Sequence, residues 1–457
     1  MSSLISATVA KLRSTFRSRK TRPAAWRIAQ LKAMKKLLKE REPEVLAALK
    51  SDLNRPYGEA ILAECSLVTS EIDHAISNLS SWMKPKSVST PMVHLPGSSK
   101  IMYEPKGVVL CISPWNYPIQ LCLAPLVSIL AAGNCVLVKP SELAPASSAF
   151  IAKYLPEYLD NDAVAVIEGG IDVATELLQE QYDHIIYTGN GTVAKIIMAA
   201  AARHLTPTTL ELGGKSPCIV AADASLDVAA KRIVFGKFLN AGQTCIAPDY
   251  LFVHESIKDK FGELLKKYIV QFFGEDPKQS EFSRIINTRH TERLQRAIQS
   301  GGNILHGGQV SVEDKYVAPT LIDQVNVDSE LMRDEIFGPV LPILPFSNLD
   351  EVIDFVLDRP KPLALYVFSG SSTTQDYIVG NTSSGGVCQN DCLMHITNPE
   401  LPFGGVGPSG MGAYHGHEGF IEFSHRKSVM NRFTIVDPSF KYPPLSESRV
   451  NWLRKLL

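Results

Sequence analysis

Residues 184–202 read HIIYTGNGTVAKIIMAAAA, and this stretch has the order of a strand, a glycine turn and a helix. The apolar run 184–188 predicts a strand, and 195–202 predicts a helix. The turn between them fits the spacing G-x-G-x-x-G/A, which in this context is typical of dinucleotide binding because glycines let the backbone approach a pyrophosphate. A tight turn before a packed helix is the alternative. The predicted coenzyme contacts are Gly189, Asn190, Gly191, Thr192, Val193 and Ala194.

Similar apolar runs alternate with helical stretches along most of the chain, for example at 163–167, 217–220 and 250–253. This alternation predicts an α/β fold with parallel sheets that are covered on both faces. The uncharged segment 107–138 also suggests a membrane span, but prolines and asparagines interrupt it. We therefore expect a buried β-α-β unit, with strands at 107–112 and 134–138 and a helix at 118–132.

Composition excludes several classes of protein. The 457 residues are enough for two or three domains, and the net charge of -1 gives no indication of a nucleic-acid partner. Most of the eight cysteines lie in apolar runs and form no CxxC pair, which favours free thiols in a cytosolic compartment. The chain shows no transmembrane span.

The first 41 residues carry twelve basic side chains and one acidic one. This composition resembles a mitochondrial presequence, yet the apolar spacing continues without a break that suggests cleavage. We expect a basic surface helix, with mitochondrial targeting and peripheral membrane contact as alternatives.

A candidate nucleophile lies in the turn 240–248, where Cys245 follows the motif Leu210–Lys215. Cysteine is a strong nucleophile near neutral pH when its thiolate is stabilised, and a turn presents the sulfur to a substrate. Glu211 is a candidate general base for it. A small buried hydrophobe is the alternative for an unpaired cysteine.

The position of Glu211 raises a conflict. The dinucleotide fingerprint places an acidic ribose ligand about 20 residues after its glycines, where Glu211 lies. Lys139 and Glu142, at the end of an apolar strand, are the other candidates for the ribose site. Motif spacing alone leaves both assignments open.

Three further groups of residues are weaker candidates for a functional role when only their local sequence is considered. Asn116, between a strand and a helix, can donate a hydrogen bond to an oxyanion. Glu335 and Phe337 precede a Gly-Pro turn. The histidines at 415, 417 and 425 lack the spacing of metal ligands, so we expect solvated loop histidines and no metal.

Taken together, these stretches resemble the aldehyde dehydrogenase superfamily, in its class 3 and fatty aldehyde dehydrogenase branch. The resemblance covers about residues 15 to 435. Its motifs, in order, are SPWNYP at 113–118, VKPSE at 138–142, YTGN at 187–190, LELGGK at 210–215, GQTC at 242–245, EIFGPV at 335–340 and PFGGVG at 402–407.

The resemblance assigns a role to each matching residue. It implies that Cys245 is the nucleophile, Glu211 the general base, and Asn116 part of the oxyanion hole. It places Lys139 and Glu142 at the adenosine ribose, and Glu335 and Phe337 at the nicotinamide ribose. Tyr117 and Phe403 are the implied substrate contacts. Gly191 and Ala194 depart from the family's Thr and Gly at these positions, which leaves NAD against NADP open, with NAD favoured because Glu142 would repel a 2′-phosphate.

The resemblance also implies an organisation and a partner. The expected parts are an NAD(P)-binding domain at 1–82 and 107–211, a catalytic domain at 212–395, an oligomerisation arm at 83–106 and 420–435, a glycine-rich active-site loop at 396–419 and a C-terminal tail at 436–457. We expect a cytoplasmic homodimer that oxidises medium- or long-chain aliphatic or aromatic aldehydes to carboxylic acids. A coenzyme A-acylating enzyme, a cysteine hydrolase and a non-enzymatic structural or stress protein are the alternatives.

Overall fold

The segment 107–138 forms the β-α-β unit expected from its sequence. In the computed structural model, which describes residues 2–435, 437 and 442–456, strand β3 (Val108–Ile112) is followed by helix α6 (Gln120–Ala132) and strand β4 (Cys135–Lys139). The two strands are parallel and fully buried. No described helix is long and apolar enough to cross a membrane.

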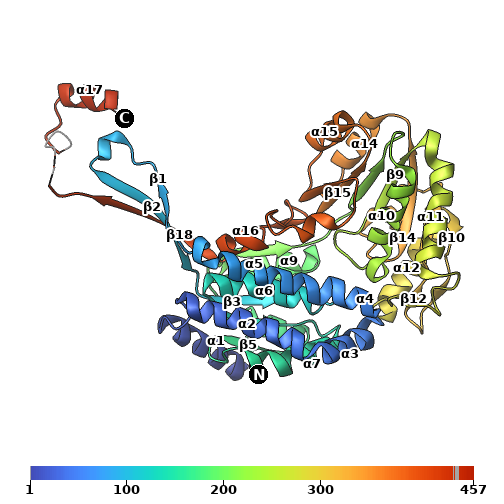
Figure 1. Cartoon of the computed structure of the whole chain (residues 1–457), viewed down its shortest axis with the longest axis horizontal. Helices are drawn as coiled ribbons and strands as arrows, with labels where there is room; N and C mark the ends of the chain where they lie inside the picture. Colours follow the sequence, from blue (N-terminus) through green and yellow to red (C-terminus); the bar gives the residue numbers. More distant parts are fainter. Residues whose placement is uncertain (1, 436, 438–441, 457) are drawn as a thin grey trace.

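This unit is the centre of a six-stranded sheet with the order β17-β7-β6-β3-β4-β5 (Figure 1). Only β17 is antiparallel to its neighbour. The other strands are β5 (Val164–Val166), β6 (His184–Thr188), β7 (Thr208–Glu211) and β17 (Gly410–Met411).

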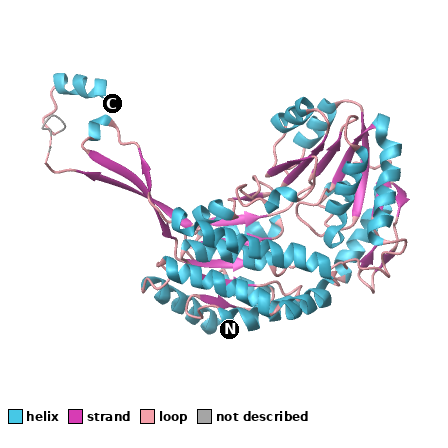
Figure 2. Ribbon diagram, viewed as in Figure 1, coloured by secondary structure: helices cyan, strands magenta, loops and turns pink. Residues whose placement is uncertain are grey.

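Helices cover both faces of the six-stranded sheet, as Figure 2 shows. One face packs on α1 (Ser2–Arg17), α8 (Ile171–Leu177) and α9 (Gly191–Ala202). The opposite side carries α2 (Ala24–Glu40), α3 (Glu42–Leu53), α5 (Leu67–Trp82), α7 (Pro145–Tyr158) and α16 (Gly416–Glu422), with the short α4 (Tyr57–Ala60) and the π-helix η1 (Ile61–Ser66) nearby.

Helix α9 begins at Gly191, four residues before the predicted start at Lys195. The side chain of Asn190 accepts a hydrogen bond from the Val193 N–H at 3.0 Å and so caps the helix. The predicted six-residue turn is therefore only two residues long, and its last four residues are the first turn of a helix.

The basic N-terminal segment forms two helices of this body, as expected for a surface helix. Helix α1 buries Ile5, Val9 and Leu12 against the sheet. Several of the basic side chains pair with acids of the body, among them Lys11–Asp162, Arg13–Asp183 and Lys20–Asp160.

A second sheet of seven strands follows, in the order β10-β13-β14-β9-β8-β15-β16. Its strands are β8 (Pro217–Val220), β9 (Tyr250–His254), β10 (Asn303–His306), β13 (Thr320–Asp323), β14 (Val340–Phe346), β15 (Ala364–Phe368) and β16 (Gly386–Gln389). Its helices are α10 (Leu226–Phe238), α11 (Lys258–Phe273), α12 (Thr288–Gly301), α13 (Glu330–Arg333), α14 (Leu349–Leu357) and α15 (Ser372–Asn381). Short elements complete it: η3 (Leu239–Gly242), η4 (Glu255–Ile257), η5 (Met394–Thr397), and the hairpin β11 (Val310–Ser311) and β12 (Tyr316–Val317). Both sheets are parallel except for one edge strand each, β10 and β17, and both are flanked by helices, which confirms the predicted α/β class.

A three-stranded antiparallel sheet projects from the six-stranded body (Figure 1). We call it the arm: β1 (Lys86–Val88), η2 (Met92–His94), β2 (Gly97–Pro105) and β18 (Ser424–Arg432). Helix α17 (Glu447–Leu456) follows it in the chain. Residues 436, 438–441 and 457 of the expected C-terminal tail lie outside the described residues.

Candidate active site

The loop that carries Cys245 has an unusual backbone. Asn240, Ala241 and Gly242 all have positive φ values, 52°, 50° and 72°, a region that costs energy for residues other than glycine. A β-carbon at Gly242 would collide with the carbonyl group of Gly338, so a side chain does not fit there. The loop then turns at 244–247, where the Ala247 N–H donates to the Thr244 carbonyl at 2.9 Å.

Cys245 is half-buried at this turn, whereas six of the eight cysteines are buried. The turn that the sequence predicts is confirmed. Burial raises the pKa of the Cys245 thiol to about 12, and the charges of Glu335 and Glu211 add to the shift. The thiol therefore lies within electrostatic reach of both carboxylates.

Gln243 anchors the loop from within the core. Its side-chain amide donates to the carbonyls of Asn240 at 3.1 Å and Arg284 at 2.9 Å, and its oxygen accepts from the Ile286 N–H at 3.0 Å. On the other side of the thiol, the Tyr366 hydroxyl donates to the Ile246 carbonyl at 2.5 Å. Sequence reasoning identified neither anchor, because both bond distant backbone groups that no local pattern indicates.

Glu211 is the last residue of β7 and is only 2% exposed. Neither of its carboxylate oxygens has a hydrogen-bond partner among the described residues. Burial raises the pKa of this carboxyl well above its usual range, and the charge of Glu422 raises it further. Burying a carboxylate without hydrogen-bond partners costs free energy of folding. Glu211 is therefore unusual among the residues of the site.

Asn116 lies in the loop between β3 and α6, and it is 4% exposed. Its side-chain amide donates to the Gln243 carbonyl at 3.0 Å. The Asn116 amide has two N–H groups, and only one of them donates to an acceptor among the described residues. The Asn116 carbonyl in turn accepts from Asn240 at 2.9 Å, so the two loops are bonded to each other.

A buried ion pair supports the Asn116 loop. Arg55 forms this pair with Glu64, and it also donates to the Asn116 carbonyl at 2.5 Å. Glu64 accepts from the N–H groups of Ile119 and Gln120, at 3.1 and 2.7 Å, near the start of α6. The sequence carried no signal for this pair, because two charged residues near a helix end usually face solvent.

Tyr117 lies between this ion pair and the Cys245 loop. Its ring is 4.7 Å from the Arg55 guanidinium, and its hydroxyl shares a 2.7 Å hydrogen bond with Thr244. Phe403 is buried, with its ring 6.3 Å from His395 and 6.2 Å from Tyr414. Aromatic side chains thus lie beside the Cys245 loop and in the glycine-rich segment.

The residues expected to hold a dinucleotide lie at the carboxyl ends of β4 and β6, the two strands that flank β3 in the sheet. Lys139 ends β4, is 4% exposed, and forms a 2.5 Å ion pair with the more exposed Glu142. Gly189 and Gly191 follow β6, and a β-carbon at Gly191 would meet nothing within 4 Å. Open space at the N-terminus of α9, together with a cation and a carboxylate at the end of β4 on the same edge of the sheet, fits a nicotinamide dinucleotide.

Glu335 and Phe337 come from the seven-stranded body. The Glu335 carboxylate packs directly against Gly213, and burial raises its pKa to about 8. Phe337 has a φ of 46°, and its ring packs edge-on against Trp115 at 5.4 Å. A non-glycine residue with positive φ is often found at functional sites.

The expectation of solvated loop histidines was wrong for His415. Its ring is buried, stacks on Tyr414 at 4.3 Å and lies 3.5 Å from the Glu71 carboxylate. The cause is the turn into α16, which folds the ring inward. The expectation was also wrong for His417, which lies in α16, is half-buried and stacks on Trp82 at 5.6 Å. His425 is exposed as expected, but it lies in strand β18. No group of metal-binding side chains occurs within the described residues.

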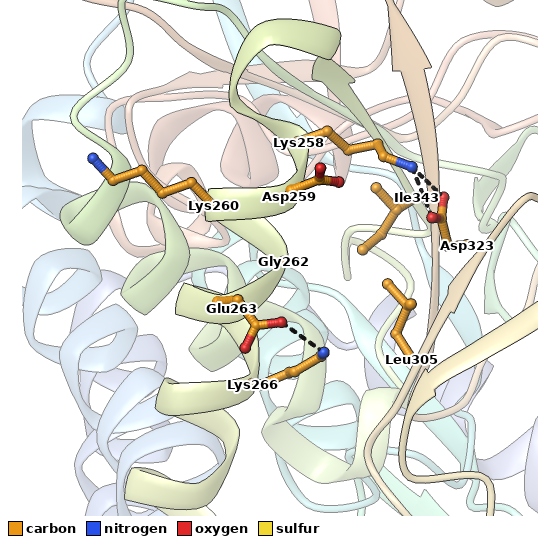
Figure 3. Close-up of a pocket in the computed structure, with 9 residues that line it drawn as sticks. All are labelled: Lys258, Asp259, Lys260, Gly262, Glu263, Lys266, Leu305, Asp323 and Ile343. Atoms are coloured by element: carbon orange, nitrogen blue, oxygen red, sulfur yellow. Dashed lines mark hydrogen bonds and ion pairs between the residues drawn. The ribbon is translucent and has the colours of Figure 1, made fainter.

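A cavity of 340 Å³ lies on the seven-stranded body, between α11 and strands β10, β13 and β14; Figure 3 shows the residues that line it. Lys258 and Asp323 pair across it at 2.7 Å, and Lys266 pairs with Glu263 at 2.8 Å. None of the predicted site residues lines it.

A dinucleotide-type sheet that faces a half-buried thiol and an unpaired carboxylate defines a class of coenzyme-dependent oxidoreductase. Comparison with known proteins identifies the family. Residues 2–429 match the model of the aldehyde dehydrogenase family, and the chain belongs to that family. It is an NAD(P)-dependent aldehyde dehydrogenase, as the sequence motifs predicted.

Several relatives are similar over nearly their whole length. The chain is 45% identical to aldehyde dehydrogenase family 3 member A2 of Mus musculus over 452 residues, which is 98% of this chain and 93% of the relative. It is 46% identical over 445 residues to the dimeric NADP-preferring aldehyde dehydrogenase of Canis lupus familiaris, covering 97% and 98%. A solved structure of Staphylococcus aureus AldH in a substrate-bound state has a TM-score of 0.96 at 42% identity, covering 99% of each chain.

Proposed function

We propose that this enzyme oxidises aldehydes through a covalent adduct on Cys245, with Glu211 as general base. The observation that carries the proposal is the Glu211 carboxylate, which is buried without a hydrogen-bond partner among the described residues and is close enough to raise the pKa of the thiol. A structural carboxylate would be hydrogen-bonded or exposed.

The chain's own groups account for each step. The Cys245 thiolate attacks the carbonyl carbon, and the negative charge moves to the oxygen. The free N–H of Asn116 and the Cys245 backbone N–H stabilise this oxyanion, each donor contributing about 3 kcal/mol. When bound, the nicotinamide supplies the acceptor for the hydride, and a thioester remains on Cys245. Glu211 then removes a proton from water, whose oxygen attacks the thioester, and the acid leaves as the thiolate re-forms.

The base separates this proposal from the alternatives. An enzyme that transfers the acyl group to coenzyme A needs no buried carboxylate to activate water, and Glu211 supports hydrolysis. A purely structural protein has no need of an unpaired buried carboxylate beside a thiol.

Lys139, Glu142, the α9 N-terminus, Glu335 and Phe337 are our proposed coenzyme contacts. Lys139 is already paired with Glu142 at 2.5 Å, so a 2′-phosphate would meet a neutralised cation and a repelling carboxylate. We therefore favour NAD+, although the canine relative's name describes it as NADP-preferring.

The test is reduced-coenzyme absorbance with purified enzyme and a panel of aliphatic and aromatic aldehydes. We expect kcat/KM with NAD+ to exceed that with NADP+ by about tenfold, which is one unfavourable charge contact. Glu142→Gln should narrow this ratio. A higher kcat/KM with NADP+ would refute the assignment of Glu142, and silence across the panel with both coenzymes would refute the reaction.

The aromatic side chains Tyr117 and Phe403 are the proposed substrate contacts, and they favour medium- or long-chain aliphatic and aromatic aldehydes. The cytoplasmic location stays a prediction, supported by the eight free cysteines. Cell fractionation of the tagged full chain tests it.

We also propose a homodimer formed through the arm. Strands β1 and β18 are both edges of the arm sheet, and exposed edges tend to pair. Met430 and Phe433 are 47% and 54% exposed. We expect light scattering to give twice the 50.1 kDa chain mass at micromolar concentration. The double variant Met430→Asp, Phe433→Asp should give monomers, whereas Leu205→Asp, at a more exposed apolar position on the body, should not. A monomeric wild type would refute the dimer.

A further inference from the structure

A second cavity, of 510 Å³, lies where the arm joins the six-stranded body. Charged side chains line it, namely Lys106, Asp183, Glu422, His425 and Arg426. Glu422, at the end of α16, is the member of this group that also raises the pKa of Glu211.

A directed chain of hydrogen bonds ends on Glu422. The Thr209 hydroxyl donates to Glu422 Oε1 at 2.6 Å, so its oxygen is free to accept from His184 Nε2 at 2.7 Å. The Lys106 ammonium then donates to His184 Nδ1 at 3.1 Å. Burial lowers the pKa of His184 well below its usual range, which agrees with a neutral ring that has one donor and one acceptor.

The backbone brings this chain close to the general base. Thr209 and Glu211 are two residues apart in β7, so their side chains lie on the same face of the strand, about 7 Å apart. Gly412 lies two residues after Gly410, which pairs with Glu211, and its missing side chain lets Glu422 and Thr209 lie close against the backbone there. A β-carbon at Gly412 would lie 2.7 Å from Glu422 Oε1 and 3.1 Å from Thr209.

Exposure differs sharply between the two carboxylates. Glu211 is 2% exposed, whereas the Glu422 side chain is 26% exposed and faces the cavity. Glu422 is therefore a carboxylate that is both near the buried base and open to solvent. Tyr414 also lies near Glu211, but burial raises the pKa of its hydroxyl well above the usual range, so it holds its proton.

We propose that Glu422 exchanges the catalytic proton between Glu211 and solvent through the cavity at the base of the arm. The inference rests on the proposed role of Glu211. In hydrolysis, Glu211 takes one proton from water while the oxygen bonds to the thioester carbon and the carbon–sulfur bond breaks. The proton then passes to Glu422 over one bridging water, and Glu422 releases it to the cavity. Both carboxylates return to their starting charge.

The charges around Glu422 suit this task. Lys106 and Arg426 attract its ionised form, Glu211 repels it, and Asp183 is already paired with Arg13 at 3.1 Å. His184 is neutral. Loss of the Glu422 charge should lower the pKa of Glu211. The increase of turnover with pH should therefore begin at a lower pH in a Glu422 variant than in the wild type.

The test measures hydrolysis of the acyl-enzyme directly. Enzyme is mixed with NAD+ and aldehyde, quenched in acid at intervals, and the acyl adduct is followed by intact-protein mass spectrometry. Rates are expressed per acylated site, so a partly unfolded sample does not distort them. The variants are Glu422→Gln, which still accepts from Thr209, Glu422→Asp, which keeps a carboxylate, and Glu418→Gln, an exposed acid on the same helix, as control.

At pH 8.5 we expect Glu422→Gln to form the adduct normally and to lose it about tenfold more slowly, a loss typical of an impaired proton transfer. Millimolar imidazole or formate should restore the rate, and Glu422→Asp should lie between. If Glu422→Gln hydrolyses the adduct at the wild-type rate, the proposal is overturned. It is also overturned if Glu422→Gln and Glu422→Asp are equally slow and neither imidazole nor formate restores the rate. Glu211→Gln, run in parallel, separates the two ideas, because normal hydrolysis in that variant would refute the base itself.

Discussion

Cys245→Ala is expected to abolish aldehyde-dependent coenzyme reduction, with a loss on the order of 10⁴-fold or more, because no covalent adduct can form. The side chain is only half-buried, and the loop is held by Gln243, Asn116 and Tyr366 rather than by the thiol. The fold should therefore survive, with a thermal unfolding midpoint within a few degrees of the wild type. Coenzyme absorbance and differential scanning calorimetry measure the two effects.

Cys388→Ala is the matched control, because Cys388 is the other half-buried cysteine. It should keep near wild-type turnover. If Cys245→Ala keeps its activity, or if both variants lose it equally, Cys245 is not the nucleophile.

Glu211→Gln should trap the enzyme after acylation, with turnover falling by about 10²- to 10⁴-fold. The amide has the size of the carboxylate but cannot accept the proton of water, so coenzyme should be reduced in a single burst of one equivalent per site. Stopped-flow absorbance shows the burst, and mass spectrometry shows the adduct on Cys245. Steady turnover at the wild-type rate would contradict the role of Glu211.

The pH dependence of the wild type follows from the same carboxyl. Its pKa in the folded enzyme is well above the usual range, and only the ionised form accepts a proton. Hydrolysis of the acyl-enzyme should therefore increase with pH through that raised pKa. A rate that is already constant above about pH 5, near an ordinary glutamate value, would show that the carboxyl is not perturbed in the working enzyme. The raised pKa also means that folding is favoured while Glu211 is protonated, and this contribution is lost as pH rises through the folded-state value.

The sequence was sufficient for the parts of the structure that local patterns control. The apolar strands and punctuating prolines of 107–138 predicted β3, α6 and β4, and the turn with Cys245 was predicted by its glycine and polar residues. The predicted start of α9 was wrong because the Asn190 side chain accepts a capping hydrogen bond from the Val193 N–H. This bond outweighs the cost of placing Gly191 in a helix. The prediction that His415 is solvated was wrong because its partner, Glu71, is more than 340 residues away in the chain.

The two candidate roles of Glu211 could not be separated by motif spacing alone. Counting from the glycines of β6 gives Glu211 as a ribose ligand. The structure places it at the inner end of β7, within electrostatic reach of Cys245, while Lys139 and Glu142 lie at the end of β4. Spacing along the chain therefore does not distinguish the two candidate ribose sites, because burial and strand order are not visible in it.

The buried pair of Arg55 and Glu64 has a consequence for shortened forms of this protein. A transcript or proteolytic fragment that lacks the first seventy residues would still carry every residue proposed for catalysis. It would lose the guanidinium that holds the Asn116 carbonyl and the carboxylate that holds the start of α6. Such a fragment would keep the sequence signature of the enzyme without its chemistry, so genomic surveys that count signatures alone would overstate how many such products are active.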